Sequence, residues 1–274
     1  MLWRLLSIFK HNVGHMTFIP LPAFNDNYIW VTQATSQQTI WAVDPGDAKV
    51  VIEYCQSQQL KLAGILVTHH HKDHTGGVAE LTQRYQCPVY GPASLAPQVV
   101  THPVQQGDEV SVADNTFLVL ETPGHTLDHL CYFAEPQDSK PLLLCGDTLF
   151  RGGCGRLFEG TPAQMLSAMT KLRSLPADTL VFGTHEYTLA NYRFAVAIDP
   201  NNTKLVEAIE EAESLREEGT PTLPSTIALE IETNPFMRFD RKEVVEGAAK
   251  LLKEDMALDA VNSFAQIRRA KDGF

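Results

Sequence analysis

The stretch "THHHKDHTGG" spans residues 68–77 and directly follows the apolar run "AGILV" of residues 63–67. It places four histidines and one aspartate within the six positions 69–74. A short apolar run of this kind, bounded by polar residues, is typical of a buried strand that ends in a loop. The two glycines permit a tight turn before the next helix. We therefore expect this stretch to present working side chains at the end of a strand.

The rest of the first two thirds of the chain repeats that organisation. From residue 17 to about 185, strand-like apolar runs alternate with helical patterns, which predicts an α/β fold. Helices are predicted over 47–59, 76–85 and 161–175, and a hairpin over 108–122. The third helix carries a complete start signal, with Thr161 as its N-cap, Pro162 at its first position and Gln164 three residues after the cap.

After residue 185 the pattern becomes helical and rich in charge. The segments 202–219 and 242–272 are predicted to be helical, joined by a Pro- and Thr-rich loop over 220–238. We therefore expect three parts. They are an N-terminal extension (1–15) ahead of a natural start at Met16, an α/β domain (16–185) and a smaller helical domain (186–274).

Composition excludes some functions and constrains others. The net charge of −11 argues against a broad nucleic-acid-binding face, and an anionic substrate would need a local positive patch. Five cysteines without a C-x-x-C pair favour free thiols in a reducing compartment. No segment is apolar over the length needed to span a membrane. These features together predict a cytoplasmic protein that binds neither nucleic acid nor membranes.

Four polar clusters each follow an apolar β-like run. The runs end in "THHHKDH", in "ETPGH" at His125, in "CGD" at Asp147 and in "GTH" at His185. Residues just past strand ends gather along one edge of a sheet, where ligand sites form. Imidazole and carboxylate are metal ligands, and seven candidates suit two ions if one aspartate bridges. A binuclear metal centre is therefore predicted.

Other polar residues receive simpler interpretations. His11, His15 and His102 are expected to be solvated or core histidines. His129 either orients a ligand or belongs to the core, and Cys145 is expected to be an inert thiol of a strand.

The pattern T-H-x-H-x-D-H at residues 68–74, followed by His125, Asp147 and His185, resembles the signature of the metallo-β-lactamase superfamily. The resemblance covers residues 17–274 and implies an αββα sandwich. It implies that one metal is held by His69, His71 and His125 and the other by Asp73, His74 and His185, with Asp147 bridging. His70 and Lys72 would not bind either metal, and Asp44 would support the ligands without binding metal itself.

Three further stretches look like the hydroxyacylglutathione hydrolase (glyoxalase II) family: residues 146–161, 183–188 and 234–272. That resemblance implies contacts to glutathione from Arg156, Tyr187, Arg268 and Lys271. Arg269 lies beside Arg268 in the sequence and is easily mistaken for the glutathione-binding residue. Phe158 stands where some members of the family have tyrosine, so one hydrogen bond to the substrate would be lost.

The activity implied is hydrolysis of S-(2-hydroxyacyl)glutathione, such as S-D-lactoylglutathione, to glutathione and D-lactate in methylglyoxal detoxification. A metal-bound hydroxide held by Asp73 and Asp147 would attack, without a separate protein base. The metals would be two divalent ions, with zinc expected and iron or manganese as alternatives. We expect a monomer whose partner is a small-molecule glutathione thioester.

Other functions compete with this one. A persulfide dioxygenase with a single iron shares the scaffold implied, but its relatives lack the complete second metal site and the helical tail. A lactonase or β-lactamase is another alternative, although in common zinc β-lactamases a cysteine stands where Asp147 stands here. A non-catalytic metal-binding or scaffold protein is disfavoured because all seven ligands and the substrate motifs are present.

Overall fold

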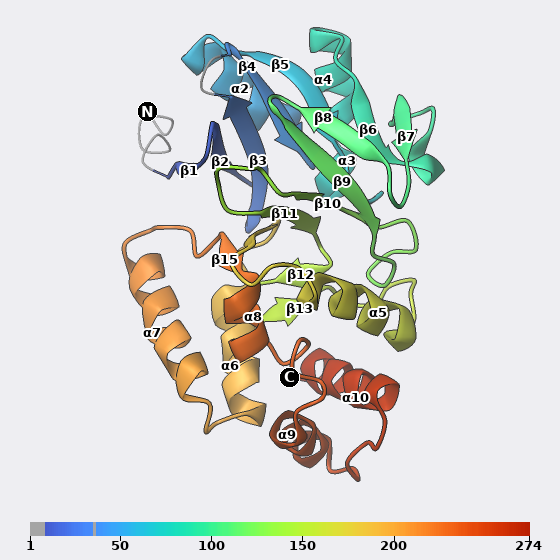
Figure 1. Ribbon diagram of the computed structural model, residues 1–274, viewed down its shortest axis with the longest axis vertical. Coiled ribbons are helices and arrows are strands. Elements are labelled where there is room, and N and C mark those ends of the chain that lie inside the picture. The colour runs from blue at the N-terminus through green and yellow to red at the C-terminus, as the bar shows by residue number, and fades with distance from the viewer. Residues whose placement is uncertain (1–8, 35–36) are drawn as a thin grey trace. The chain divides into compact units, whose positions relative to one another are not determined.

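The computed structural model describes residues 9–34 and 37–274, so most of the predicted extension 1–15 lies outside the described residues. The chain divides into two compact units (Figure 1). Unit 1 comprises residues 1–121, 128–146 and 184–186, and unit 2 comprises 122–127, 147–183 and 187–274. The chain thus passes between the units several times, and each unit is described by itself below.

Unit 1 contains a seven-stranded sheet in the order β1 to β7. Its first four strands form an antiparallel meander, whereas β4 to β7 pair in parallel. Their bounds are β1 (His11–Val13), β2 (Met16–Ala23), β3 (Asn27–Ala34), β4 (Thr39–Val43), β5 (Lys61–Leu66), β6 (Val89–Pro92) and β7 (His102–Val104).

Two helices cover one face of this sheet. They are α2 (Ala48–Gln58) and α4 (Val78–Tyr85), and the single-turn helix α3 (Lys72–Thr75) lies between them in sequence. Alternate residues of β2 and β3, such as Ile19 and Val31, share a buried apolar cluster with Val51 of α2 and Leu81 of α4. Because side chains alternate across a strand, one face of the sheet packs against the helices through these positions.

The second sheet of unit 1 is antiparallel, with the order β11-β10-β9-β8. Its strands are β8 (Glu109–Val112), β9 (Asn115–Glu121), β10 (Leu130–Ala134) and β11 (Leu142–Gly146). The predicted hairpin is confirmed, because β8 and β9 pair around the turn at 113–114. All five residues of β10 and of β11 are buried. The hydroxyl of Tyr132 on β10 donates to the carbonyl of Val67, 2.7 Å away, just beyond β5.

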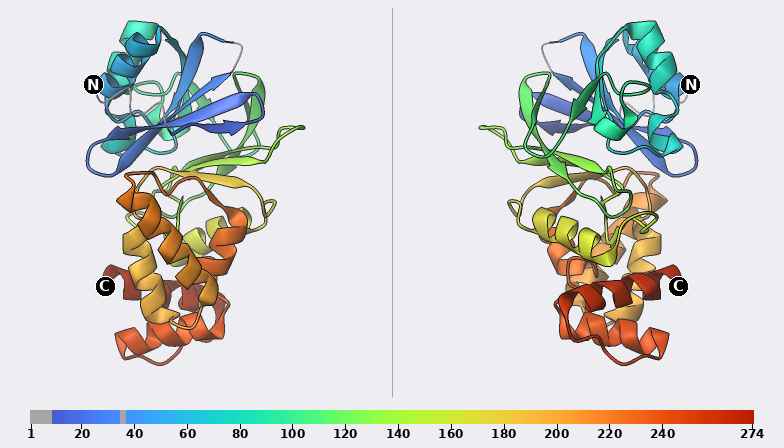
Figure 2. Two further views of the ribbon diagram at one scale, coloured as in Figure 1. Left: turned by 90° about the vertical axis from the view of Figure 1, so that its left-hand side faces the viewer. Right: turned by 90° about the vertical axis from the view of Figure 1, so that its right-hand side faces the viewer.

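Unit 2 combines short strands with helices. The strands are β12 (Leu149–Phe150), β13 (Gly153–Cys154), β14 (Leu180–Gly183) and β15 (Ser225–Thr226); the helices are α5 (Pro162–Arg173), α6 (Thr188–Ile198), α7 (Thr203–Glu217), α8 (Ile227–Thr233), α9 (Lys242–Leu252) and α10 (Ala260–Asp272). Figure 2 shows α6 and α7 side by side, and α9 packs against both α6 and α10. The start predicted for α5 is confirmed, because Thr161 and Gln164 form a reciprocal capping box.

The structure differs from two details of the sequence-based prediction in unit 2. The loop predicted over 220–238 contains a strand and a helix, since Thr226 caps α8 by accepting from the backbone N–H of Leu229. The helical stretch predicted over 242–272 is two helices, because α9 ends at a left-handed residue, Lys253. Short elements within a Pro-rich segment give a weak periodic signal, so they escape pattern analysis.

A buried polar cluster fixes the loop between β12 and β13. The carboxylate of Glu230 on α8 is fully buried and accepts from the backbone N–H of Gly152 (2.8 Å) and the Asn234 amide (2.9 Å). The same amide donates to the carbonyls of Phe150 (3.2 Å) and Gly153 (2.9 Å). The C-terminal helices therefore hold the stretch of chain that begins at Asp147.

Candidate functional site

Asp44, at the end of β4, anchors the start of the histidine-rich loop. Its carboxylate accepts from the backbone N–H (2.7 Å) and the hydroxyl (2.8 Å) of Thr68. The hydroxyl of Thr68 in turn lies 3.0 Å from Nδ1 of His69. Nδ1 of His74 lies 3.1 Å from Oδ2 of Asp44, the same oxygen that accepts from the Thr68 hydroxyl. Asp44 therefore contacts His74 directly and His69 through Thr68, and its support of metal ligands stays a prediction.

The histidines of this loop are brought together as predicted. The ring centroid of His69 lies 4.7 Å from that of His71 and 4.1 Å from that of His74. His69 and His74 are completely buried. His129 is also buried, and its ring stacks on His69 at 4.9 Å. Its structural role is therefore packing directly against a predicted ligand.

Asp73, His74 and His185 form a donor group within unit 1. One ligand atom from each residue lies within 4.8 Å of the others. Oδ2 of Asp73 lies 3.3 Å from Nε2 of His74 and 3.5 Å from Nε2 of His185. One carboxylate oxygen and two imidazole nitrogens this close together are suitable donors for a divalent cation such as zinc. The donor set therefore fits a metal ion.

Two residues that the sequence analysis missed contact this group. Oδ1 of Asp26 lies 2.8 Å from Nδ1 of His185, and Nδ2 of Asn27 donates to Oδ2 of Asp73 over 3.1 Å. Asp26 lies in the turn between β2 and β3, where Phe24 has a positive φ of 52°, and Asn27 follows it as the first residue of β3. The "NDN" pattern reads only as a turn, so the sequence gives no sign of partners so far away.

The remaining two predicted ligands belong to unit 2. Nε2 of His125 lies 3.5 Å from Oδ2 of Asp147, and Nδ1 of His125 lies 2.7 Å from the carbonyl of Arg156. A Cβ at Gly155 would lie 2.1 Å from the carbonyl of Asp147 and 2.9 Å from the His125 ring. Only glycine fits there, so the "GCGR" stretch packs tightly against both ligands.

Two of the predicted substrate-binding residues of unit 2 are accessible. The Arg156 side chain is 61% exposed, and its Nε lies 3.5 Å from Oδ1 of Asp272. Tyr187 is 36% exposed, and its ring meets Phe150 edge to face. Phe158 is exposed and meets the His125 ring in the same way. Arg156 and Tyr187 can therefore reach a ligand without rearrangement.

The predicted pair on α10 is more enclosed. Arg268 is only 6% exposed: Nη2 lies 2.9 Å from Oδ1 of Asp272, and Nη1 donates to the carbonyl of Cys154 (3.2 Å). The Lys271 amine donates to the carbonyl of Ala190 (3.1 Å). Burial and the positive charges of Arg268 and Arg193 lower the pKa of Lys271 to about 8.

Arg269, the neighbour open to mis-assignment, forms a separate ion pair. Its side chain is 54% exposed and pairs with Glu254. Successive helical residues point about 100° apart. The geometry therefore separates Arg269 from the group formed by Arg268, Lys271 and Asp272.

The other singled-out residues lie apart from these donors. His11 meets Trp30 edge to face, and burial lowers its pKa. His102 stacks on Tyr90 at 4.9 Å. Cys145 is fully buried in β11.

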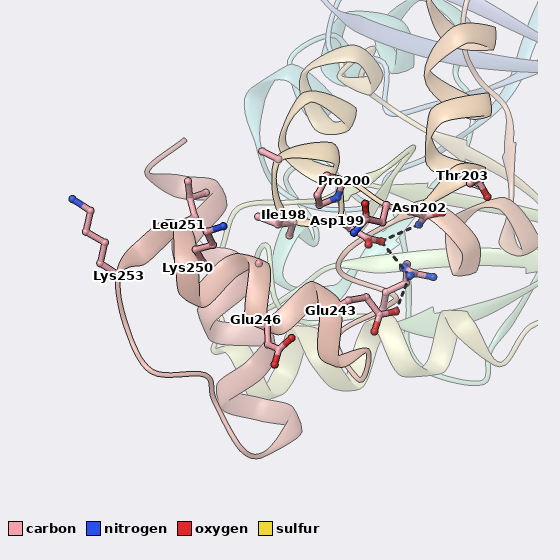
Figure 3. Close-up of a pocket in the computed structure, with 14 residues that line it drawn as sticks. Ile198, Asp199, Pro200, Asn202, Thr203, Glu243, Glu246, Lys250, Leu251 and Lys253 are labelled. Atoms are coloured by element: carbon pink, nitrogen blue, oxygen red, sulfur yellow. Dashed lines mark hydrogen bonds and ion pairs between the residues drawn. The ribbon is translucent and has the colours of Figure 1, made fainter.

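A cavity of about 950 Å³ also lies in unit 2 (Figure 3). It is bounded by the end of α6, the start of α7 and by α9, and an ion pair between Asp199 and Arg238 (3.1 Å) lies in its wall. None of the predicted ligands or substrate-binding residues lines it. Volume alone therefore does not locate the chemistry of this chain.

Across residues 9–34 and 37–274, no helix has both the length and the apolar character needed to cross a lipid bilayer.

Solved structures share the fold. The chain is similar to ETHE1 from Myxococcus xanthus, with a TM-score of 0.62, 26% identity and coverage of 84% of this chain and 88% of that one. It is also similar to the BLEG-1 B3 metallo-beta-lactamase, with a TM-score of 0.59, 22% identity and coverage of 81% and 99%. The predicted fold class, a metallo-β-lactamase fold with a C-terminal helical part, is confirmed.

Sequence comparison narrows the relationship. The family model of the metallo-beta-lactamase superfamily matches residues 43–185, and that of the hydroxyacylglutathione hydrolase C-terminus matches 186–274. The chain is 56% identical to the hydroxyacylglutathione hydrolase of Marinomonas sp. (strain MWYL1), over 94% of this chain and 100% of the relative. It is 48% identical to that of Hahella chejuensis (strain KCTC 2396), over 93% and 98%. The chain therefore belongs to the hydroxyacylglutathione hydrolase family of the metallo-beta-lactamase superfamily.

Proposed function

We propose that this hydrolase cleaves the thioester of S-(2-hydroxyacyl)glutathione, with S-D-lactoylglutathione as substrate and glutathione and D-lactate as products, the second step of methylglyoxal detoxification. Family membership supports the class of reaction. The observation that carries the proposal is the convergence of Asp73, His74 and His185 on one point, since this half of the metal centre distinguishes the proposed enzyme from the alternative with a single iron.

The metal centre proposed here uses all seven predicted ligands. Membership of this superfamily and the His/Asp donor groups of this chain both support the binding of divalent metal ions. We assign His69, His71 and His125 to one ion, Asp73, His74 and His185 to the other, and Asp147 to both, with zinc at each position. When bound, such ions lower the pKa of a coordinated water to about 7 and polarise the thioester carbonyl.

Residues next to these donors orient them. A metal-ligating imidazole is held in one tautomer by the group that faces its other nitrogen. That group is the Thr68 hydroxyl for His69, the Asp44 carboxylate for His74 and the Asp26 carboxylate for His185. No protein base is assigned. The leaving thiolate needs little help from a general acid, because a cysteine-type thiol has a pKa of about 8.5.

Binding of the anionic tripeptide is assigned to a basic cluster in unit 2. Arg156 and Tyr187 contribute exposed groups, and Lys271 contributes a partly buried amine. Arg268 is engaged by Asp272 and by the Cys154 carbonyl, so it contributes its charge and the placement of Asp272. The cluster supplies the local positive potential that a chain of net charge −11 requires for an anionic ligand.

We further propose that the enzyme acts as a monomer in the cytoplasm. The five cysteines are all buried free thiols, in keeping with a reducing compartment. The proposed partner is the glutathione thioester alone.

The decisive test is turnover of S-D-lactoylglutathione by the metal-loaded chain, followed as loss of the thioester absorbance. Asp147→Ala is expected to lose most activity together with metal. Asp114→Ala is the matched control, because Asp114 is an exposed carboxylate in the β8–β9 turn. A metal-loaded wild type that leaves this substrate intact would contradict the proposal, and oxygen consumption with glutathione persulfide would instead support the iron oxygenase.

A further inference from the structure

We propose that Asp26 and Asn27, where the β2–β3 turn meets β3, are positioning residues that control one half of the metal centre selectively. The inference rests on the proposed function only in that Asp73, His74 and His185 are taken as the ligands of one metal. Neither turn residue is itself assigned to the metal or to the substrate.

The side chains of Asp26 and Asn27 contact two of the three ligands, His185 and Asp73. Asp26 faces Nδ1 of His185 at 2.8 Å, which leaves Nε2 of that ring directed at Asp73. Asn27 is 5% exposed and donates to Oδ2 of Asp73 at 3.1 Å. That oxygen is the one that faces both imidazoles, so the amide fixes the carboxylate rotamer that completes the group.

The backbone of the turn holds His185 from both sides. The N–H of Tyr28 donates to the carbonyl of Thr184 (2.7 Å), and the N–H of Glu186 donates to the carbonyl of Asp26 (2.8 Å). Asn27 and His185 thereby form an isolated antiparallel bridge. The Tyr28 hydroxyl adds a hydrogen bond to the Glu186 carboxylate (2.9 Å). The segment 184–186 is thus locked onto the turn in a fixed register.

The other half of the centre is oriented by a different route. His69 is held by Thr68, which is held by Asp44. Asp44 also faces His74, so its support is shared, whereas the support from Asp26 and Asn27 acts on His185 and Asp73. Loss of the turn's side chains should therefore weaken one metal position and spare the other.

The expected effect is measurable without substrate. Removal of a group that orients a ligand typically weakens metal affinity about 10- to 100-fold. Purified wild type, Asp26→Ala and Asn27→Ala would be equilibrated with buffered zinc, and bound zinc would be counted by atomic emission. We expect two zinc ions in the wild type, and a second ion bound about 10- to 100-fold more weakly in both variants, with the first unchanged.

Controls separate positioning from general damage to the fold. Asp26→Asn keeps an oxygen that can accept from Nδ1 of His185, so it should recover most of the affinity lost in Asp26→Ala. Asp114→Ala should behave as wild type. Thermal unfolding of the zinc-free chains checks that the variants fold. Kinetics with one zinc ion bound should show a fall in kcat larger than the change in KM.

The outcomes distinguish this inference from the proposed function. Variants that retain two ions with wild-type affinity, or that lose both ions together, would overturn the role of the turn, as would a wild type that binds one ion only. If the wild type binds two ions, the variants bind one and the thioester remains uncleaved, the turn keeps its role and the proposed substrate is wrong.

Discussion

Nδ1 of His70 lies 3.0 Å from Oδ1 of Asp128, and the other oxygen of that carboxylate accepts from the Ser94 hydroxyl at 2.6 Å. The middle histidine of the stretch therefore contacts an acidic residue that is not one of the seven predicted ligands. We predict that His70→Ala retains both metals and at least about a tenth of wild-type kcat, because the ring lies outside the ligand set. Metal counting and steady-state kinetics check this.

His69→Ala is the matched comparison, since it removes the same side chain one position earlier. It should lose metal and rate together, because His69 is fully buried among the other histidines. Equal losses in the two variants would mean that His70 is needed for the centre.

A second prediction concerns Gly46, two residues after Asp44 in the chain. A Cβ at this position would lie 1.9 Å from the carbonyl oxygen of Asp73, so the backbone carrying that ligand would have to move. Gly46→Ala should therefore lower metal affinity and kcat by at least about tenfold. Gly107→Ala is the control, because a Cβ added there has no atom within 4 Å. Its φ of 88° makes the alanine cost some stability. Wild-type zinc binding by Gly46→Ala would contradict the packing described.

A third prediction follows from the lowered pKa of Lys271. With a pKa of about 8, the amine loses its charge above that pH, so kcat/KM for the anionic substrate should fall as pH rises through 8. Lys271→Arg should remain charged and delay the fall. The unfolded chain keeps this proton up to about 10.5, so the group's contribution to folding stability increases from pH 8 upwards. Identical profiles for wild type and Lys271→Arg would refute the assignment.

A fourth prediction concerns the buried carboxylate of Glu230. Its removal would leave the buried N–H of Gly152 without its acceptor, and the amide of Asn234 would keep only its two carbonyl acceptors. Glu230→Ala should therefore lower the free energy of unfolding by at least about 2 kcal/mol, as measured by urea titration. Glu230→Gln, which keeps an acceptor, should cost less. Glu213→Ala, at an exposed position of α7, should change the free energy by less than about 0.5 kcal/mol.

Much of this architecture was predictable because it obeys local rules. Apolar runs followed by polar residues gave β5, β9, β11 and β14 and placed the four ligand clusters at their ends. The cap at Thr161 was predictable because capping needs only residues three positions apart. The assignment of each ligand to a metal, and of Arg156 and Tyr187 to substrate, stays a prediction.

The rest depends on partners far apart in the chain. Asn27 and Asp73 are separated by 46 positions, and Asp26 and His185 by 159, so no local pattern could join them. The burial of Arg268 was equally hidden, because a charged residue in a helix normally indicates a solvated face. Here the guanidinium packs over Phe236 at 4.8 Å and pairs with Asp272.

The interlocking of unit 2 limits what protein engineering can do with the C-terminal helices. Arg151, which follows β12, donates to the carbonyl of Thr222 (2.7 Å) and to the hydroxyl of Tyr192 (3.0 Å), while Asn234 holds the carbonyls of Phe150 and Gly153. A chain cut after residue 186 would keep every proposed metal ligand but leave this arginine and these carbonyls without their partners. The helices after residue 186 therefore hold in place the segment that starts at Asp147.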